Sequence, residues 1–565
     1  MPSMLRTSLL MTAALLAGAC SRPPETRTAG ETVLVANANI LTMDGKGTRA
    51  SAMAYRDGRI LAVGDEATVK QAVKGDYQYV DLNGQTVVPG FIESHEHMMM
   101  QGGLLPWADL TPATTRNREQ ALEKLRRQKP DQDGWILGFG VEPLLYEGEA
   151  GQPTWRESLD QVSKNIPVFV IHNSGHAAYA NSKAFELAGI SRDTPNPKGG
   201  EFLKDENGEL EGYINGQPAW TQIHGFPAVS RETTWHSAEV RARVGITTAS
   251  ELAIMSSRYL EHLQEVTASP DFPVRIVGGM FISLPGLDEV APRVKEYETP
   301  LFKVRFIKTW ADGSIQGGTG AMTKGYYRFE RAAKSGLRYS QKDFDSQIRK
   351  ILELGLWPAI HANGDAAMDM ALNAIEYARK ETGDTHARPQ LIHCQYVRPD
   401  QFDRIKRLGA SMTFFVTHVY NYGDLHRDVF LGPERGSRIS AIKRAFEKGI
   451  PAAMHDDAPV ALPNPLFNMW VAVNRRTRSG KALGPDLRIT PRQALAAYTR
   501  EAAYEFGMEK AIGSLEPGKL ADFVVLAEDP LGVVPNHIKD IRIIATVMNG
   551  KVTYEQGAMY EPEPR

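Results

Sequence analysis

The middle of the chain alternates between short apolar runs that end in polar residues and longer segments with helical periodicity. The apolar runs are Gly245–Glu251, Val274–Met280, Val304–Asp312, Trp357–Asn363, Gln390–Gln395, Ser411–Val416 and Pro451–Asp457. The helical segments between them include Ser340–Leu354, Ala366–Lys380 and Ser437–Lys448. An earlier apolar run that starts at Val87 brings the number of strands to eight. Repeated alternation of this kind predicts a parallel sheet, and eight units predict an α/β fold of the (β/α)8 TIM-barrel type.

Both ends of the chain show a different pattern, of short β-segments separated by Asp-Gly or Asn-Gly turns. The N-terminal segments are Thr32–Ile40, Ser51–Tyr55 and Ile60–Val63, and the C-terminal ones are Asp522–Leu526, Ile543–Met548 and Lys551–Tyr554. Such turns between short apolar runs are typical of hairpins. We therefore expect residues 31–86 and 513–560 to pair into one small β-sandwich domain, with the barrel at 87–512 between them.

Two further apolar runs fall in the long gap between the first and second barrel strands. They are Trp135–Val141 and Val168–Ile171. Because they are surplus to an eight-stranded barrel, we expect them to belong to an insertion at about residues 108–234. Its position in the order of strands predicts that it covers the mouth of the barrel.

The first thirty residues predict export. Residues 1–19 combine the positive charge of Arg6, a short apolar core and small residues before Cys20, as in a signal peptide. The sequence Ala17-Gly18-Ala19-Cys20 resembles a bacterial lipobox, so we expect a lipid on Cys20 and a tether over residues 20–30. The alternative is an ordinary secretory signal cut beside Cys20. Either way, the expected location is the bacterial cell envelope, with lipidation anchoring the chain to the membrane on the periplasmic side.

Composition narrows the range of partners. The 565 residues are 42% hydrophobic and 23% charged, with a formal net charge of -2. This length predicts at least two domains, and this charge offers no basic field for nucleic acid. We expect a small-molecule substrate and no nucleic-acid partner; the oligomeric state is left open, with a homodimer as one option.

The polar residues that end the barrel strands carry the candidate chemistry. Side chains alternate along a strand, so His95 and His97 project to one side while Glu96 points away. The same alternation places Lys308 inward with Val304 and Phe306, His361 with Ala359, His393 with Leu391, and Asp457 with His455. Because the carboxyl ends of barrel strands meet at one mouth, these residues should converge. The predicted metal-binding set is His95, His97, Lys308, His361, His393 and Asp457.

Imidazoles with one carboxylate suit a divalent metal, most of all Zn²⁺, as one ion or two. Lys308 fits such a set only as a carbamate formed with CO₂, or else it is not a ligand. Asp457 is the predicted catalytic base, which accepts a proton from water and returns it to a leaving nitrogen. Each residue also has a simpler interpretation: His361 and His393 as core histidines, Lys308 as an ion-pair partner of Asp312, and Asp457 as a cap for the next turn.

Several ordered motifs resemble the amidohydrolase superfamily. Val88-Pro89-Gly90-Phe91-Ile92-x-Ser94-His95-x-His97 is similar to its opening signature, and Gly513-Ser514-Leu515-Glu516-Pro517-Gly518-Lys519 to its closing one. Between them, Lys308-(x)₃-Asp312-Gly313-Ser314, His361-Ala362-x-Gly364-Asp365 and His455-x-Asp457-Ala458-Pro459 resemble the YtcJ-like branch, which contains N-substituted formamide deformylase. The resemblance spans about residues 31 to 556.

This resemblance implies metal-dependent hydrolysis of an amide or related C–N bond in an N-acyl, N-formyl or peptide-like small substrate. It also implies that His176, from the insertion, lines the substrate pocket; the alternative is an ordinary loop histidine. Glu93, Glu251 and Asp456 differ from the residues usual in the family at these positions. These differences affect the expectation about the substrate more than the expectation of a bound metal. A dipeptidase, a cyclic amidohydrolase and a non-catalytic ligand-binding envelope lipoprotein remain as alternatives.

Overall fold

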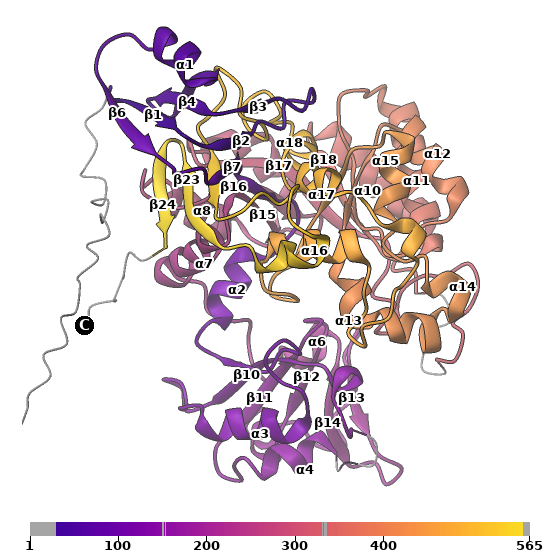
Figure 1. Cartoon of the computed structure of the whole chain (residues 1–565). Coiled ribbons are helices and arrows are strands. Elements are labelled where there is room, and N and C mark those ends of the chain that lie inside the picture. The colour runs from indigo at the N-terminus through magenta and orange to yellow at the C-terminus, as the bar shows by residue number, and fades with distance from the viewer. Residues whose placement is uncertain (1–29, 150–151, 153, 330–331, 333–335, 557–565) are drawn as a thin grey trace, which may run out of the picture.

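The barrel predicted from the alternating pattern is present in the computed structural model, which describes residues 30–149, 152, 154–329, 332 and 336–556. Its eight parallel strands run in chain order around the sheet (Figure 1). They are β8 (Phe91–Glu93), β15 (Ile246–Ile254), β16 (Arg275–Phe281), β17 (Phe302–Trp310), β18 (Trp357–Ala362), β19 (Gln390–His393), β20 (Ser411–Phe414) and β21 (Ala452–Met454). Just beyond the strand ends, the Asp457 N–H donates to the His95 carbonyl at 3.2 Å, which joins the last strand to the first.

Helices cover the outside of this sheet. They include α7 (Arg231–Arg243), α8 (Ser257–Thr267), α10 (Gln341–Glu353), α11 (Asp365–Thr382), α12 (Pro399–Arg407), α15 (Ile442–Lys448), α16 (Pro465–Asn474), α17 (Pro491–Ala497) and α18 (Arg500–Glu505). In α11 the buried residues Ala367, Ala371, Ala374 and Ala378 recur at helical spacing and form the face that packs inward. Gly383, at a φ of 71°, ends α11 in the left-handed conformation that glycine tolerates best.

Side chains fill the barrel itself. Seven of the strands each contribute one apolar residue to a single cluster, namely Ile92, Leu252, Val277, Phe306, Ala359, Ile392 and Ala453. Phe506, just after α18, packs into the same cluster and closes one end. The barrel is therefore a packed core whose chemistry has to sit at the strand ends.

The two chain ends form the predicted β-sandwich. One sheet contains β24 (Lys551–Glu555), β23 (Ile543–Met548), β22 (Phe523–Leu526), β7 (Thr86–Pro89), β2 (Asn39–Leu41) and β3 (Arg49–Ala50). The other contains β5 (Arg59–Gly64), β4 (Ala52–Arg56), β1 (Thr32–Ala36) and β6 (Tyr77–Asp81). The turn between β23 and β24 uses Asn549 and Gly550 at φ of 50° and 72°, as a two-residue hairpin turn requires.

One apolar run is divided between two sheets. We predicted a single barrel strand from Val87 onward, but Val88 pairs with Val524 in the sandwich, and only Phe91–Glu93 joins the barrel. Gly90 lies at the break, packed against the side chain of Thr247, where any larger residue would collide. The run is continuous in hydrophobicity because both of its halves are buried, so the pattern alone does not show the break.

The surplus strands form a third sheet. It contains β13 (Glu201–Lys204), β14 (Leu210–Asn215), β12 (Ala177–Ala180), β11 (Val168–His172), β10 (Ile136–Val141) and β9 (Ala108–Asp109). Figure 1 shows it as a separate lobe beside α13 (Thr417–Leu425). The predicted signal peptide and Cys20 lie outside the described residues. Among those that are described, no helix has the length and apolar character to cross a bilayer.

Candidate metal centre

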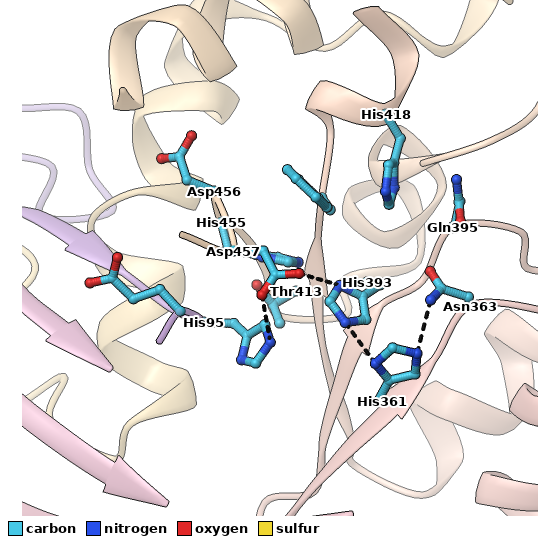
Figure 2. Close-up of polar contacts among 12 residues, drawn as sticks. His95, His361, Asn363, His393, Gln395, Thr413, His418, His455, Asp456 and Asp457 are labelled. Atoms are coloured by element: carbon cyan, nitrogen blue, oxygen red, sulfur yellow. Dashed lines mark hydrogen bonds and ion pairs between the residues drawn. The ribbon is translucent and has the colours of Figure 1, made fainter. Parts of the chain in front are cut away.

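The strand ends bring the six predicted ligands together: five are buried, and His97 is partly exposed. Figure 2 shows four of them, His95, His361, His393 and Asp457. His95 and His97 follow β8, and Lys308 lies in β17. His361 lies in β18, His393 ends β19, and Asp457 comes shortly after β21. The ring centroids of His95 and His97 are 5.1 Å apart, and those of His95 and His393 are 5.2 Å apart. Residues separated by more than 300 positions in the sequence thus meet at the mouth of the barrel.

One half of the cluster is built around Asp457. Its Oδ1 lies 3.3 Å from His95 Nε2 and 3.6 Å from His97 Nε2. Two ligand atoms of a tetrahedral zinc ion, each about 2.0–2.2 Å from the metal, are about 3.3–3.6 Å apart. The spacing therefore matches one edge of a zinc coordination shell. Lys308 Nζ lies 3.2 Å from the same His95 nitrogen.

The other half is a pair of facing histidines. His361 Nδ1 lies 2.9 Å from His393 Nε2. His361 Nε2 lies 3.0 Å from both the Gly313 carbonyl and Asn363 Nδ2; because a carbonyl can only accept, a hydrogen bond to Gly313 requires the proton on Nε2. The lone pair of Nδ1 then points toward His393, an orientation that a second-shell hydrogen bond commonly imposes on a metal-binding histidine.

Backbone conformation, in addition to strand alternation, aims two of these side chains. We predicted that Leu391 and His393 share the inner face of their strand, but Ile392 is the residue that packs inside the barrel. His393 reaches the cluster because its φ of 72° departs from strand geometry. Asp457 has a φ of 55°. Positive φ in a non-glycine residue is uncommon and carries a strain cost that the surrounding structure has to offset.

The hydrogen-bonding capacity of the cluster is only partly used. Within the described part of the chain, Asp457 Oδ1 and the Nδ1 atoms of His95, His97 and His393 are buried without a hydrogen-bond partner. Unpaired buried polar atoms are rare in native proteins, and several of them in one cluster call for a ligand. Asp457, His95 and His393 can each offer one atom to a shared ion. The donor set therefore fits a divalent cation.

Burial sets the protonation state of the histidines. It lowers the pKa of His97 to about 3, with a smaller contribution from Lys308, and holds the pKa values of His95, His361 and His393 well below the usual range. The imidazoles are thus neutral at physiological pH. A neutral imidazole is the form that binds a metal.

Lys308 and Asp457 contribute an amine and a carboxyl group to the cluster, and each shifts the pKa of the other. Burial raises the pKa of Asp457 to about 8 and lowers the pKa of Lys308 to about 7, while the attraction between the two opposes both shifts. The alternative of an ion pair between Lys308 and Asp312 does not occur. The Asp312 carboxylate instead accepts backbone N–H groups of Ala321, Asn363 and Gly364 at 2.8–3.0 Å.

Asp456, next to Asp457 in the chain, also affects the pKa of Asp457. The main cause of the raised pKa of Asp457 is burial, and Asp456 contributes only a smaller part. The Asp456 side chain is turned away, and it accepts from the Asn468 amide at 2.8 Å and the Tyr498 hydroxyl at 3.3 Å.

His176 lies in the insertion, just before β12. It contributes to lowering the pKa values of His97 and His361, and its own pKa is lowered to about 4, first by burial and then by the charge of Arg338. The insertion also contacts the barrel directly, because the Tyr422 hydroxyl on α13 donates to Glu142 at 2.8 Å.

The sequence analysis left out one histidine of the cluster. The His455 ring lies 5.1 Å from that of His95 and 5.0 Å from that of His393, and in the described structure neither of its nitrogens has a hydrogen-bond partner. The signal was available, because alternation puts His455 on the same face as Asp457. Strand alternation gives only the face on which His455 lies, and it does not tell whether an imidazole nitrogen is close enough to the other histidines to share a metal ion.

The chain was compared with models of known protein families. The family model described as the amidohydrolase family matches residues 78–554. The chain belongs to the amidohydrolase family. This membership is what the opening and closing motifs predicted, and the family fold is the barrel seen here.

Relatives of this amidohydrolase match it over almost its whole length. N-substituted formamide deformylase of Arthrobacter pascens is 26% identical over 551 residues, covering 93% of this chain and 98% of that protein. The protein YtcJ of Bacillus subtilis (strain 168) is 29% identical, covering 92% and 98%. An uncharacterized metal-dependent hydrolase from Pyrococcus horikoshii OT3 has the same fold, with a TM-score of 0.69 at 24% identity over 90% of this chain and 99% of that one.

Proposed function

We propose that this amidohydrolase is a metal-dependent enzyme that cleaves an amide or related C–N bond in a small substrate. The observation that carries the proposal is the position of His95 Nε2 and His97 Nε2, which lie 3.3 and 3.6 Å from Asp457 Oδ1 and match the spacing of a zinc shell. Asp457 Oδ1 itself is buried without a hydrogen-bond partner among the described residues. The name of the Arthrobacter relative, a formamide deformylase, supports a C–N bond as the target.

His95, His97 and Asp457 would hold one divalent ion, most suitably Zn²⁺, and His361 with His393 a second. When bound, such an ion polarises the substrate carbonyl and lowers the pKa of a water molecule. Asp457 accepts the proton of the attacking water and passes it to the nitrogen as the C–N bond breaks, so the products are a carboxylic acid and an amine.

Lys308 is suited to a second role. Burial lowers the pKa of its amine, so the neutral form is available near neutral pH. We propose that this amine adds to CO₂, forming an N–C bond and releasing one proton. The product is an anionic carbamate, which a metal pair can share where an ammonium would repel it. His95 Nε2, 3.2 Å away, places Lys308 beside the ligands.

A metal assay joined to a substrate panel tests the proposal. Metal content is measured by mass spectrometry, and hydrolysis of N-formyl amines, N-acyl amino acids and dipeptides is followed before and after chelation. We expect one or two ions per chain, activity on at least one class, loss on chelation and recovery with Zn²⁺. A metal-loaded protein that hydrolyses none of the three classes would favour a ligand-binding protein and overturn the proposed reaction.

A further inference from the structure

A second group of polar side chains lies beside the metal cluster, and the proposed chemistry does not use it. It consists of two amides and two imidazoles, Gln316, Gln395, His418 and His426, which we call the amide–imidazole network. Gln395, His418 and His426 are buried, and Gln316 is half-buried. In Figure 2, His418 and Gln395 lie on the same side of the metal cluster as His361.

Measured contacts place His418 between the metal cluster and the insertion. The Phe415 ring packs against the His418 ring, with 4.3 Å between centroids, and against the His455 ring of the cluster at 5.1 Å. On the other side, the Tyr422 ring lies 6.1 Å from that of His418, and its hydroxyl donates to Glu142 of the insertion at 2.8 Å. One aromatic side chain therefore separates His418 from each of the two regions.

Hydrogen bonds between the amides and the imidazoles fix the tautomers of both histidines. Gln316 Nε2 lies 3.2 Å from His418 Nε2. Gln395 Nε2 lies 2.7 Å from His426 Nε2 and 3.3 Å from Gln316 Oε1. Because a side-chain amide nitrogen can only donate, both imidazoles accept at Nε2. Burial holds the pKa of His418 well below its usual range and lowers the pKa of His426 to about 3, so each ring is neutral and carries its proton on Nδ1.

The network leaves two donors and one acceptor unused. The Nδ1 atoms of His418 and His426 and the Oε1 atom of Gln395 are buried and have no hydrogen-bond partner in the described ranges. Atoms left in this way cost free energy until a partner is supplied. Since every member of the network is neutral, it offers no counter-charge to a carboxylate or an ammonium group. A neutral amide, with one carbonyl and one N–H, matches a site of donors and acceptors better.

We propose that His418 Nδ1 donates a hydrogen bond to the carbonyl oxygen of a second amide group in the substrate, beyond the scissile C–N bond. The preferred class is then an N-acyl amino acid amide or a similar uncharged diamide, rather than an N-acyl amine without the second amide. This inference rests on the proposed function for the reaction itself, but the binding of the second amide is separable from it.

The test combines matched substrates with two variants of His418. Each N-acetyl amino acid amide, with side chains from alanine to phenylalanine, is paired with the N-acetyl amine that lacks the carboxamide, and the readout is the ratio of their kcat/KM values. His418→Asn keeps a donor at the position of Nδ1, because its amide nitrogen is bonded to Cγ. His418→Gln instead keeps its amide at the position of Nε2, next to Gln316. We expect His418→Gln to lower the ratio by about 3- to 10-fold and His418→Asn to retain most of it.

His262→Gln is the matched control. It removes an imidazole from α8 on the outside of the barrel, where Nε2 lies 2.8 Å from Thr234 Oγ1, and it should leave the ratio unchanged. Metal content and thermal unfolding of the three variants, measured in parallel, show that the cluster and the fold are intact. A ratio that stays at the wild-type value in His418→Gln, or that falls as far in His418→Asn as in His418→Gln, would overturn the inference.

A binding experiment separates this inference from the proposed reaction. N-acetylphenylalanine amide and the matching amine are titrated by calorimetry into metal-loaded Asp457→Asn protein with and without His418→Gln. Binding of the diamide that weakens by about 3-fold or more, with no change for the amine, supports the second-amide site even if the wild-type protein hydrolyses neither compound. Equal affinity of both proteins for the diamide overturns the site, even if the wild-type protein proves to be an active amide hydrolase.

Discussion

Two groups of buried ionisable side chains lie back to back in this barrel and use their hydrogen-bonding capacity in opposite ways. Glu96, between His95 and His97, faces away from the mouth and forms a bidentate pair with Arg241, at 2.7 and 2.6 Å. Arg241 also donates to the Ser237 carbonyl at 2.8 Å and to the side chains of Ser237 and Gln101. Both members of the pair are fully buried, and both charges are compensated.

The cluster at the mouth is buried to nearly the same degree, yet it leaves Asp457 Oδ1 and several imidazole nitrogens unmatched within the described structure. A satisfied charge pair holds neighbouring elements in one arrangement, here α7 against the segment that carries the two histidines. An unsatisfied set costs free energy until a ligand supplies the missing partner. The comparison indicates that the paired charges stabilise the fold, whereas the unpaired polar atoms at the mouth are the ones available to bind a ligand.

The largest expected effect is on activity. Asp457→Asn should lower kcat by about 10³-fold, because the amide cannot accept a proton from water. It should not lower the stability of the metal-free protein, since it removes a buried carboxyl group whose Oδ1 has no hydrogen-bond partner in the described structure. Kinetics and thermal unfolding of the same preparation test both parts. A large fall in unfolding temperature would show that Asp457 is a structural residue and would break the comparison.

The next effect is on stability. Arg241→Met leaves Glu96 as an unpaired buried charge and should cost about 3–5 kcal/mol of unfolding free energy, measured by denaturant titration. The double variant Arg241→Met/Glu96→Gln should recover part of this cost, because it removes the stranded charge as well. If the single variant proves as stable as wild type, the pair does not have the structural role assigned to it.

A third prediction concerns Glu505, a buried carboxyl group with a hydrogen-bond partner at Oε2 but none at Oε1 among the described residues. Glu505, at the end of α18, is fully buried; its Oε2 accepts from Gln390 at 2.8 Å, and burial raises its pKa to about 8. The unfolded chain releases this proton near pH 4.5 and the folded chain only near pH 8, so the wild type loses stability as pH rises between these values.

Glu505→Gln mimics the protonated form and removes this dependence. The variant should therefore gain on the wild type with rising pH, by an amount on the order of 2–4 kcal/mol at pH 8 and close to zero near pH 4.5. The test is to measure the unfolding midpoints of both proteins between about pH 4.5 and pH 8. A difference between the two proteins that stays constant with pH would mean that Glu505 is ionised in the fold.

The smallest expected effect concerns the contact between the insertion and the barrel. Tyr422→Phe removes the hydrogen bond to Glu142 and should cost about 1–2 kcal/mol in the docking of the lobe. We expect KM to rise by a few-fold with little change in kcat, because the lobe lines the mouth without supplying the reacting groups. A change confined to kcat would place Tyr422 with the reacting groups instead.

Strand and helix periodicity was enough to predict the eight-stranded barrel, the sandwich built from both chain ends and six residues of the cluster, but it left out His455. Periodicity was insufficient where the boundaries of a strand depend on which other strand it pairs with. The run at Val87–Ile92 is apolar throughout, and only its pairing with Val524 on one side and Ile246–Ala249 on the other shows that it is two strands. Strand parity likewise assigned Leu391 to the interior, where Ile392 lies.

The sequence by itself determined which residues stand at the strand ends, because hydrophobic periodicity and turn chemistry act over a few neighbouring positions. The tertiary structure alone decided how those side chains are aimed, as the positive φ of His393 and Asp457 shows. It also decided which buried charges are compensated: Glu96 by Arg241 and Asp312 by backbone N–H groups, whereas Asp457 Oδ1 has no hydrogen-bond partner among the described residues. Such compensation depends on contacts between residues far apart in the chain, which no local pattern records.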